Sequence, residues 1–269
     1  MQFKFKAVGA AVALVLATGA AHANGLTLPG VSTGSDLVIN IWDNDANNAG
    51  FTQDLGVNLT SFNPANSFSL TLTNPGAIAA FNQNVTGTLW DITAGKGTGN
   101  ASTAGTYLIS SQTQTTAGDT ASQIDGAISG LASQYGFLKT KSGNTFASST
   151  TGSVVTTSAD SEWAASTAQG SGNLSEIDTQ FASDGTSTSS VLYFDQLTTD
   201  GSTASGSVLS GFWTLTFDAL TATTATLTWT PTSTVPLPAA VWLLGSGLLG
   251  LAGIGRRRFG IGNAAAANA

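Results

Sequence analysis

The clearest pattern in the chain is a period-two alternation of apolar and polar residues. It runs through Phe68–Leu72, Trp213–Phe217 and Leu227–Trp229, where aromatic or aliphatic residues alternate with serine and threonine. Successive side chains of a β-strand point to opposite faces, so this alternation predicts strands with one buried and one exposed face. The same reasoning predicts further strands at Leu37–Trp42, Thr52–Val57, Val85–Ile92, Thr106–Ser110 and Val191–Leu197.

A helical pattern occupies the middle of the chain. Between Asp119 and Gln134, the apolar residues Ile124, Ile128 and Leu131 recur at spacings of four and three, after a capping position at Asp119 or Thr120. Asn74-Pro75 predicts the start of a second, short helix. Weaker helical patterns cover Ser158–Thr167 and Ser175–Ala182, and Ser142–Thr157 and Gly170–Asn173 are predicted to be loops.

These elements together indicate the fold class. Many short strands separated by Gly, Asn and Asp turns, without a regular strand–helix–strand rhythm, favour an antiparallel arrangement. We therefore predict a mainly β protein: a jelly-roll-like antiparallel β-sandwich over roughly residues 30–230, with a few short helices inserted between residues 75 and 182.

The first 23 residues have the layout of a secretory signal peptide. Lys4 and Lys6 precede an apolar run from Ala7 to Ala17, and Ala21 and Ala23 form a small-residue cleavage site around His22. The mature chain is then expected to begin at Asn24. The alternative, a permanent N-terminal anchor, is disfavoured because the apolar run is short.

A second targeting segment lies near the C-terminus. Pro236 and Pro238 fix an extended peptide that cannot join a following helix. The run from Ala239 to Ile254 carries no charge, and with its flanks it approaches the roughly 20 residues that a membrane-spanning helix needs. Three arginines follow, at positions 256–258, and would stay on the cytoplasmic side. A buried core helix is the alternative, but it would carry a polar face that this run lacks.

This order of proline motif, glycine-rich apolar helix and arginine cluster resembles the PEP-CTERM protein-sorting signal. The resemblance covers about residues 235–258, with Leu237 where the name-giving motif has glutamate. It implies recognition by an exosortase-type membrane enzyme, in a Gram-negative bacterium, and export linked to extracellular polysaccharide. The residues matched to the processing motif are Val235, Pro236, Leu237, Pro238 and Ala239, and those matched to the stop-transfer cluster are Arg256, Arg257 and Arg258.

The two signals divide the chain into four parts. They are a signal peptide (1–23), an exported β-rich body ending in a threonine-rich stalk (24–234), the sorting signal with its transmembrane helix (235–258) and a cytoplasmic tail (259–269). Chains that carry the resembled signal usually end soon after the arginines, whereas this one continues to Ala269. The similar sortase signal of Gram-positive bacteria needs a Leu-Pro-x-Thr-Gly pentapeptide, which this sequence lacks. We expect export across the inner membrane, anchoring by the C-terminal helix, and release to the surface or exterior after processing.

The exported body is strongly acidic. It keeps three lysines against fifteen acidic residues, a net charge of −12, so it should repel nucleic acid. The chain has no cysteine, and its one histidine, His22, lies in the predicted signal peptide. Those two absences exclude Ser-His-Asp triads, Cys-His pairs and zinc sites built on His or Cys in the mature body. Only carboxylate-based catalysis stays open.

A calcium site is the one metal centre that the sequence suggests. Carboxylate and amide oxygens fall at positions 1, 3, 5 and 12 of a calcium loop, but position 6 is Asn48 instead of glycine. The alternative is a polar hairpin turn between two strands, because Asn and Asp tolerate left-handed backbone geometry. The four candidate ligands are Asp43, Asp45, Asn47 and Asp54.

Three tryptophans are candidates for contact with sugar rings. Trp42, Trp90 and Trp163 could act as stacking platforms, although aromatic residues on strands more often fill the core. The sequence thus predicts a non-catalytic, exported surface or extracellular-matrix protein associated with exopolysaccharide. The alternative is a secreted polysaccharide hydrolase that depends on carboxylates. No cofactor other than calcium is expected.

Overall fold

The computed structural model describes the body of the chain and leaves gaps in it. The described residues are 25–30, 32–43, 49–72, 74–83, 88–100, 103–111, 119–147, 149, 151–157, 159–160, 180–181, 189–217 and 223–232. The strands in this part are β1 (Asp36–Asp43), β2 (Ala49–Asn58), β3 (Phe68–Leu72), β4 (Thr88–Lys96), β5 (Gly105–Ser111), β6 (Ser153–Thr157), β7 (Gln180–Phe181), β8 (Ser189–Thr199), β9 (Ala204–Val208), β10 (Gly211–Phe217) and β11 (Ala225–Pro231). The helices are α1 (Pro75–Gln83) and α2 (Ala121–Thr140).

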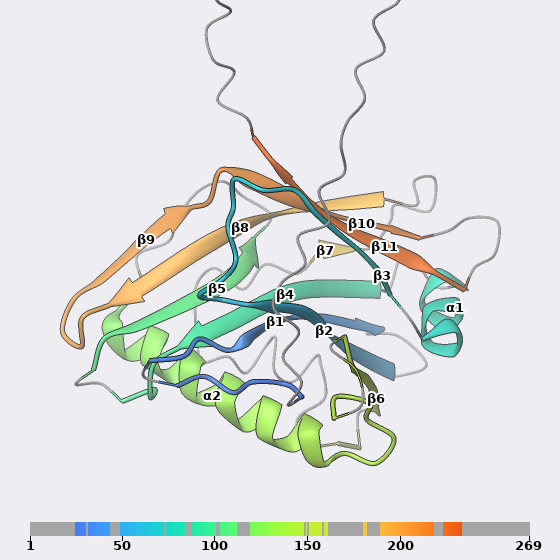
Figure 1. The fold of residues 1–269 in the computed structure, drawn as a ribbon, viewed down its shortest axis with the longest axis horizontal. Coiled ribbons are helices and arrows are strands. Elements are labelled where there is room, and N and C mark those ends of the chain that lie inside the picture. Colours follow the sequence, from blue (N-terminus) through green and yellow to red (C-terminus); the bar gives the residue numbers. More distant parts are fainter. Residues whose placement is uncertain are drawn as a thin grey trace, which may run out of the picture. The chain divides into compact units, whose positions relative to one another are not determined.

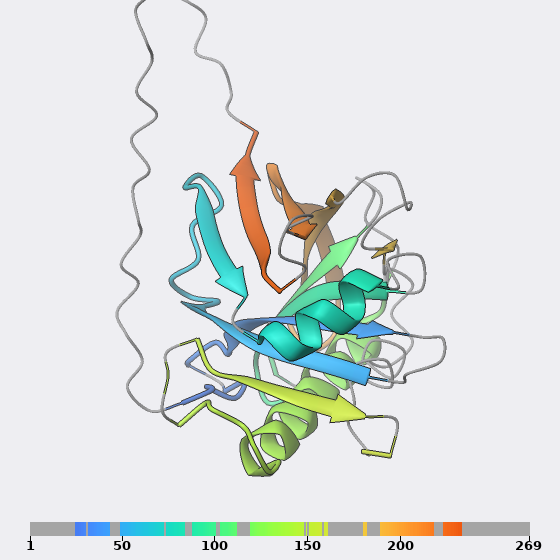
Figure 2. The same cartoon turned by 90° about the vertical axis from the view of Figure 1, so that its right-hand side faces the viewer.

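All strand pairings in the described residues are antiparallel, and they join the strands into one sheet. The strand order is β3-β11-β10-β8-β5-β4-β1-β2-β6, with β7 paired to β4 and β9 paired to β8. Figures 1 and 2 show that the sheet folds over itself: β3, β11 and β10 form an upper layer, and β5, β4, β1 and β2 lie below them. The prediction of a mainly β, antiparallel protein is confirmed.

Strand β8 connects the two layers. Its first residues, up to Leu192, pair with β10, whereas residues 193–199 pair with β5. A strand that changes partners along its length belongs to both layers, so no separate connection between them is needed. The two layers therefore share one continuous hydrogen-bonded path.

The main core fills the space between the two layers. The inward residues of β10 and β11, including Trp213 and Trp229, meet those of β1 and β4, including Ile39 and Trp90. Phe62, Phe194, Trp213 and Trp229 form a cluster of rings whose centroids lie 5.2–6.0 Å apart. Helix α1 starts at a proline, is capped by the Asn74 side chain on the Ala77 N–H at 3.2 Å, and adds Ile78 and Phe81 to this core.

Helix α2 covers the opposite face of the lower layer, as Figure 1 shows. Its N-terminus is held by a capping box: the Thr120 Oγ1 accepts from the Gln123 N–H, and the Gln123 side chain accepts from the Thr120 N–H at 2.9 Å. Its buried residues, such as Ile128 and Leu131, pack on Val38, Tyr107 and Leu197 in a second core. The lower layer is therefore buried on both sides, which explains why every residue of β1 is buried.

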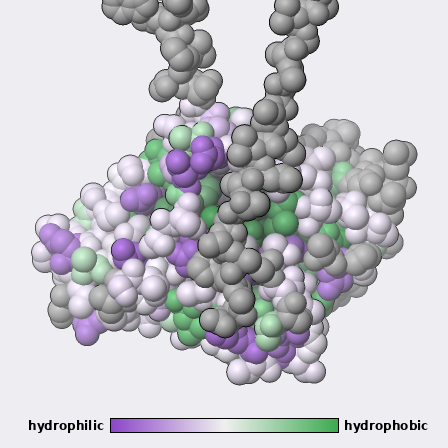
Figure 3. All heavy atoms as spheres, in the orientation of Figure 1, coloured by the Kyte–Doolittle hydropathy of each residue, from purple (hydrophilic) through white to green (hydrophobic). Residues whose placement is uncertain are grey.

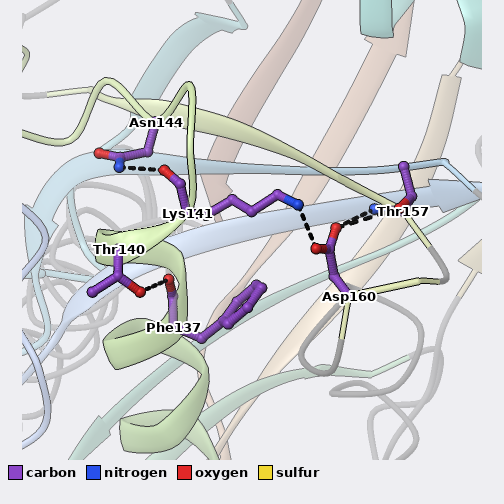
Figure 4. A network of polar contacts seen from close by, with 6 residues as sticks. All are labelled: Phe137, Thr140, Lys141, Asn144, Thr157 and Asp160. Atoms are coloured by element: carbon purple, nitrogen blue, oxygen red, sulfur yellow. Dashed lines mark hydrogen bonds and ion pairs between the residues drawn. The ribbon is translucent and has the colours of Figure 1, made fainter.

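The C-terminal end of α2 is fastened to the segment after β6. The Lys141 ammonium group pairs with the Asp160 carboxylate, which also accepts from the Thr157 N–H at 2.9 Å (Figure 4). The hydrogen bond from Lys141, followed by that from Thr157, lowers the pKa of Asp160. This contact fixes the path of the chain at the outer edge of β6.

Several expectations from the sequence need correction. Residues 153–157 form strand β6, although Ser142–Thr157 was predicted to be a loop, because β2 supplies pairing partners for a short Ser/Thr/Val segment. Gln180–Phe181 pair with β4, so the end of the Ser175–Ala182 helical pattern is a strand. Strand β9 was not predicted at all. Helix α2 is confirmed, but it continues to Thr140, six residues beyond Gln134.

The targeting segments lie outside the described residues. These are the signal peptide with Ala21 and Ala23, the sorting motif with its apolar helix and arginines, and the tail from Phe259 to Ala269. Within the described part, no helix is both long and apolar enough to cross a membrane. The predicted transmembrane helix at 239–254 therefore stays a prediction.

Candidate functional site

The outer face of the upper layer carries a regular array of hydroxyl groups. In β10 and β11, Trp213, Leu215, Leu227 and Trp229 point inward, so the threonines between them point outward. We call this array the threonine face; its members are Ser69, Thr71, Thr214, Thr216, Thr226, Thr228 and Thr230.

The strand register places these residues in rows across the sheet. Thr214 pairs with Thr228, which pairs with Ser69, and the next row contains Thr216, Thr226 and Thr71. Neighbouring strands lie about 4.8 Å apart and residues two apart along a strand lie about 6.8 Å apart. The hydroxyl groups therefore form a two-dimensional array with regular spacing.

The threonine face carries no charge, although the body around it is acidic. The segments β3, β10 and β11 contain no Asp, Glu, Lys or Arg. Four of the seven members are exposed, and Thr214, Thr216 and Thr228 are half-buried. In the view of Figure 3, pale residues of near-neutral hydropathy lie between purple and green patches of the described surface. The face therefore offers hydrogen bonds without a strong field of either sign.

Two aromatic residues border the threonine face. Phe212 precedes Trp213 and pairs with Thr230, so it lies on the outer side of β10. Tyr193 follows Leu192, the partner of Trp213, and has the same outward parity on β8. Both side chains are half-buried. An aromatic surface next to hydroxyl rows combines an apolar contact area with hydrogen-bond donors and acceptors.

The buried carboxylates lie on another face of the molecule, beneath α2. Asp91 accepts from the Asn40 Nδ2 at 2.8 Å, and the Asn40 Oδ1 accepts from the Thr52 hydroxyl at 2.8 Å and from the Gln134 Nε2 at 3.3 Å. The four side chains come from β4, β1, β2 and α2. Burial raises the pKa of Asp91 to about 7, and the hydrogen bond from Asn40 opposes that rise.

A buried pair of carboxylates, Asp36 and Asp54, lies along the same side of β1 and β2. Burial, followed by the nearby charge of Asp36, raises the pKa of Asp54 to about 7, while the Gly56 N–H bond to Asp54 opposes the rise. Asp36 accepts from the Thr27 N–H at 2.7 Å and from the Asn58 side chain at 3.3 Å. The Tyr135 hydroxyl of α2 donates to the Asp36 carbonyl oxygen at 2.9 Å.

These carboxylates lie buried under α2, and the hydrogen bonds that join α2 to the sheet run from Gln134 to the Asn40 Oδ1 and from Tyr135 to the Asp36 backbone carbonyl. Asp36, Asp54 and Asp91 are each at most 4% exposed, and residues of the sheet, the helix and the loops enclose them. A raised carboxyl pKa can mark a catalytic acid, but a catalytic group must also reach its substrate. In the described part of the chain, no three Asp, Glu, His or Cys side chains form a group that could hold a metal.

The structure separates two of the four predicted calcium ligands. Asp54 pairs with Val38, five residues before Asp43 on β1, which is roughly 17 Å at about 3.4 Å per residue. The odd separation also puts the two side chains on opposite faces of the sheet. Strands β1 and β2 pair antiparallel on either side of residues 44–48, which agrees with the alternative of two strands joined by a turn, and Asp45 and Asn47 lie outside the described residues. Asp43 and Asp54 therefore do not converge on one ion.

Two of the three predicted stacking tryptophans are core residues. Trp42 is 1% exposed and Trp90 is fully buried, so neither can contact a sugar ring. Trp163 lies outside the described residues. The aromatic residues beside the threonine face, Phe212 and Tyr193, were not predicted. Their outward orientation follows from the alternation of inward and outward residues around Trp213. That alternation is present in the sequence and could have identified Phe212 as an outward aromatic residue.

No family model, curated protein or solved structure matches the chain.

Proposed function

We propose that this chain is an exported, non-catalytic surface or matrix protein that binds exopolysaccharide through the threonine face. The observation that carries the proposal is the uncharged array of hydroxyls in register on β3, β10 and β11. Such an array can exchange hydrogen bonds with the hydroxyl groups of a polysaccharide, and Phe212 and Tyr193 add an apolar contact area. Export and release depend on the signal peptide and the C-terminal sorting signal.

The proposal favours a neutral polymer over an acidic one. The exported body carries a net charge of −12, which repels anionic polymers at low and moderate salt. No lysine or arginine lies on the strands of the threonine face to bind a carboxylate or sulfate group. A neutral glycan would therefore be retained more strongly than a polymer rich in uronic acids.

The hydrolase alternative has less support. Retaining or inverting hydrolysis needs two carboxyl groups that flank a glycosidic bond within reach of substrate. The carboxylates that the structure brings close together, Asp36 and Asp54, lie under α2. We also propose the finer description of the fold, a jelly-roll-like sandwich, since two layers enclose one core and the upper layer leaves its outer face for other contacts.

Removing hydroxyls from the threonine face should weaken polysaccharide binding. We expect Thr214→Val, Thr226→Val and Thr228→Val together to reduce retention on neutral exopolysaccharide by at least tenfold. Each loss removes hydrogen bonds worth about 0.5–1.5 kcal/mol, and valine keeps the shape and strand propensity of threonine. The measurement is co-sedimentation of the exported protein with insoluble polymer from its own host.

The matched control is Thr106→Val, which removes the same hydroxyl from β5, outside the threonine face. This variant should bind like the wild type. Equal retention of the triple variant and the wild type would exclude the threonine face as the binding surface. Release of reducing ends, abolished by one Asp→Asn change, would favour the hydrolase instead.

The processing of the exported chain gives a separate prediction. We expect mass spectrometry of the mature surface protein to find an N-terminus at Asn24 and a C-terminus near Pro236–Pro238. The reason is the order of the two signals, with the positive cluster at 256–258 holding the second one in the membrane. A mature protein that retains Arg256–Ala269 would contradict processing at the sorting motif.

A further inference from the structure

Strands β3 and β6, at the two ends of the strand order, are protected to very different degrees. On β6, the Ser153 N–H donates to the Thr145 hydroxyl at 2.8 Å, and the Ser153 carbonyl accepts from the Thr145 N–H at 2.9 Å. At the other end, the Asp160 carboxylate accepts from the Thr157 N–H and holds Lys141. Counting contacts between described residues, the backbone of Val155 alone stays open between these two ends. A loop and an ion pair that occupy the backbone groups of an edge strand prevent another strand from pairing with it.

Within the described part of the chain, strand β3 has no such protection. It ends the strand order and pairs with β11 alone (Figure 2). Among the described residues, no hydrogen bond is made to the side of β3 that faces away from β11. Its sequence, Phe-Ser-Leu-Thr-Leu, contains no charge and no proline, and its pairing shows no bulge. Charged residues, prolines and bulges are the features by which sheet edges usually avoid pairing with another chain, and β3 has none of the three.

The core is also incompletely closed beside β3. Phe68 and Leu70 point inward and pack on the main core, yet both are only half-buried. Another strand placed against β3 would cover the open sides of these residues and bury apolar surface that now faces water. An open edge and a partly open core at the same place favour the addition of a strand.

We propose that two copies of this chain pair through β3 and continue the sheet from one copy into the other. The pairing is antiparallel about a two-fold axis at Leu70, so Ser69 of one copy lies opposite Thr71 of the second copy. A five-residue strand overlaps fully with its own copy only in this register. Such a self-complementary contact is the usual form of a two-fold dimer.

Charge explains why a second copy suits this edge. Two bodies of net charge −12 repel each other, so they can approach closely only where the surface carries no charge. Strands β3, β11 and β10 form an uncharged border at one end of the strand order. The proposal goes beyond polysaccharide binding and holds whether or not the threonine face binds a glycan. Because the two-fold axis is perpendicular to the sheet, both threonine faces would lie on the same side of the dimer.

Charge substitutions on β3 test the pairing. The lysine variant carries Ser69→Lys and Thr71→Lys, and the glutamate variant carries Ser69→Glu and Thr71→Glu. Both positions are exposed, so the fold should tolerate the new side chains. In the proposed register, each variant places like charges opposite each other, whereas a mixture of the two places Lys opposite Glu. The measurement is sedimentation velocity of the full chain in detergent, with circular dichroism to check the fold.

We expect the wild type to sediment as a dimer, each variant alone as a monomer, and an equimolar mixture as a dimer with one copy of each. Recovery in the mixture also shows that the variants are folded. Association through the C-terminal segment would be unaffected by these charges, so a dimer that persists in both variants would overturn the proposal. A wild type that stays monomeric at the highest concentration reached, or variants that do not recover on mixing, would overturn it as well.

Discussion

Trp229→Ala should lower the free energy of unfolding by about 3–5 kcal/mol, the usual cost of truncating a buried aromatic residue. Trp229 is fully buried at the centre of the ring cluster, 5.2 Å from Trp213, 5.6 Å from Phe62 and 6.0 Å from Phe194 between centroids. Its Nε1 donates to the Pro64 carbonyl at 2.9 Å, so alanine also removes a hydrogen bond between β11 and the loop before β3. Because domains are stable by only about 5–15 kcal/mol, this loss should be visible in urea unfolding.

Gly211 provides a sharp control for this prediction. A Cβ atom at Gly211 would lie 2.2 Å from the Trp229 ring, so Gly211→Ala should cost about 1–3 kcal/mol through overpacking. In the Trp229→Ala background, the ring is gone and the added methyl group has room. The two effects should therefore be less than additive in a double-mutant cycle. A loss below about 1 kcal/mol for Trp229→Ala would show that the ring cluster is not the centre of the core.

The strands that could be predicted best are those with one face in water. In β3, β10 and β11, serine and threonine occupy the outward positions, so the alternation in the sequence matches the alternation in burial. The threonine face follows directly from this pattern. The pairing of Thr214 with Thr228 and Ser69 does not, because the register depends on which strands become neighbours.

The strands of the lower layer are harder to predict from the sequence, because the upper layer covers one of their faces and α2 covers the other. Asn40 and Asp91 stand at positions of their strands that a half-exposed sheet would turn to water, yet both are 1% exposed. They are buried because α2 packs over them and Gln134 reaches the Asn40 Oδ1. The apolar stripe of α2 predicts that the helix packs on something, but it does not name the sheet face. The polar network was therefore invisible in the sequence.

This buried network leads to the second large effect, on the pH dependence of stability. Burial raises the pKa of both Asp54 and Asp91 from the ordinary value of 3.8 to about 7. Between those two pH values, the folded protein holds protons that the unfolded chain has already released. Stability from these groups is therefore fully present below about pH 4 and is lost as the pH rises to about 7, by at most about 1.4 kcal/mol per pH unit for each group.

No histidine complicates this range, because His22 is the only one in the chain and lies in the predicted signal peptide. Hydrogen bonds lower the pKa values of Asp160 and Asp200, so these groups contribute their change in more acidic solution. Burial also raises the pKa of Asp125 on α2, which acts in the same direction as Asp54 and Asp91. We expect urea unfolding between pH 5 and pH 8 to show stability decreasing as the pH rises.

Asp91→Asn separates this effect from a general loss of packing. Asparagine cannot ionise, and its Oδ1 can accept the same hydrogen bond from the Asn40 Nδ2 that Asp91 accepts at 2.8 Å. The variant should match the wild type within about 1 kcal/mol near pH 4 and exceed it in stability at pH 8, because an unpaired buried charge is costly. Asp54→Asn added to Asp91→Asn should flatten the profile further, whereas Asp200→Asn, at an exposed turn, should leave the slope above pH 5 unchanged. Parallel profiles for the wild type and Asp91→Asn would show that this carboxyl group does not titrate in that range.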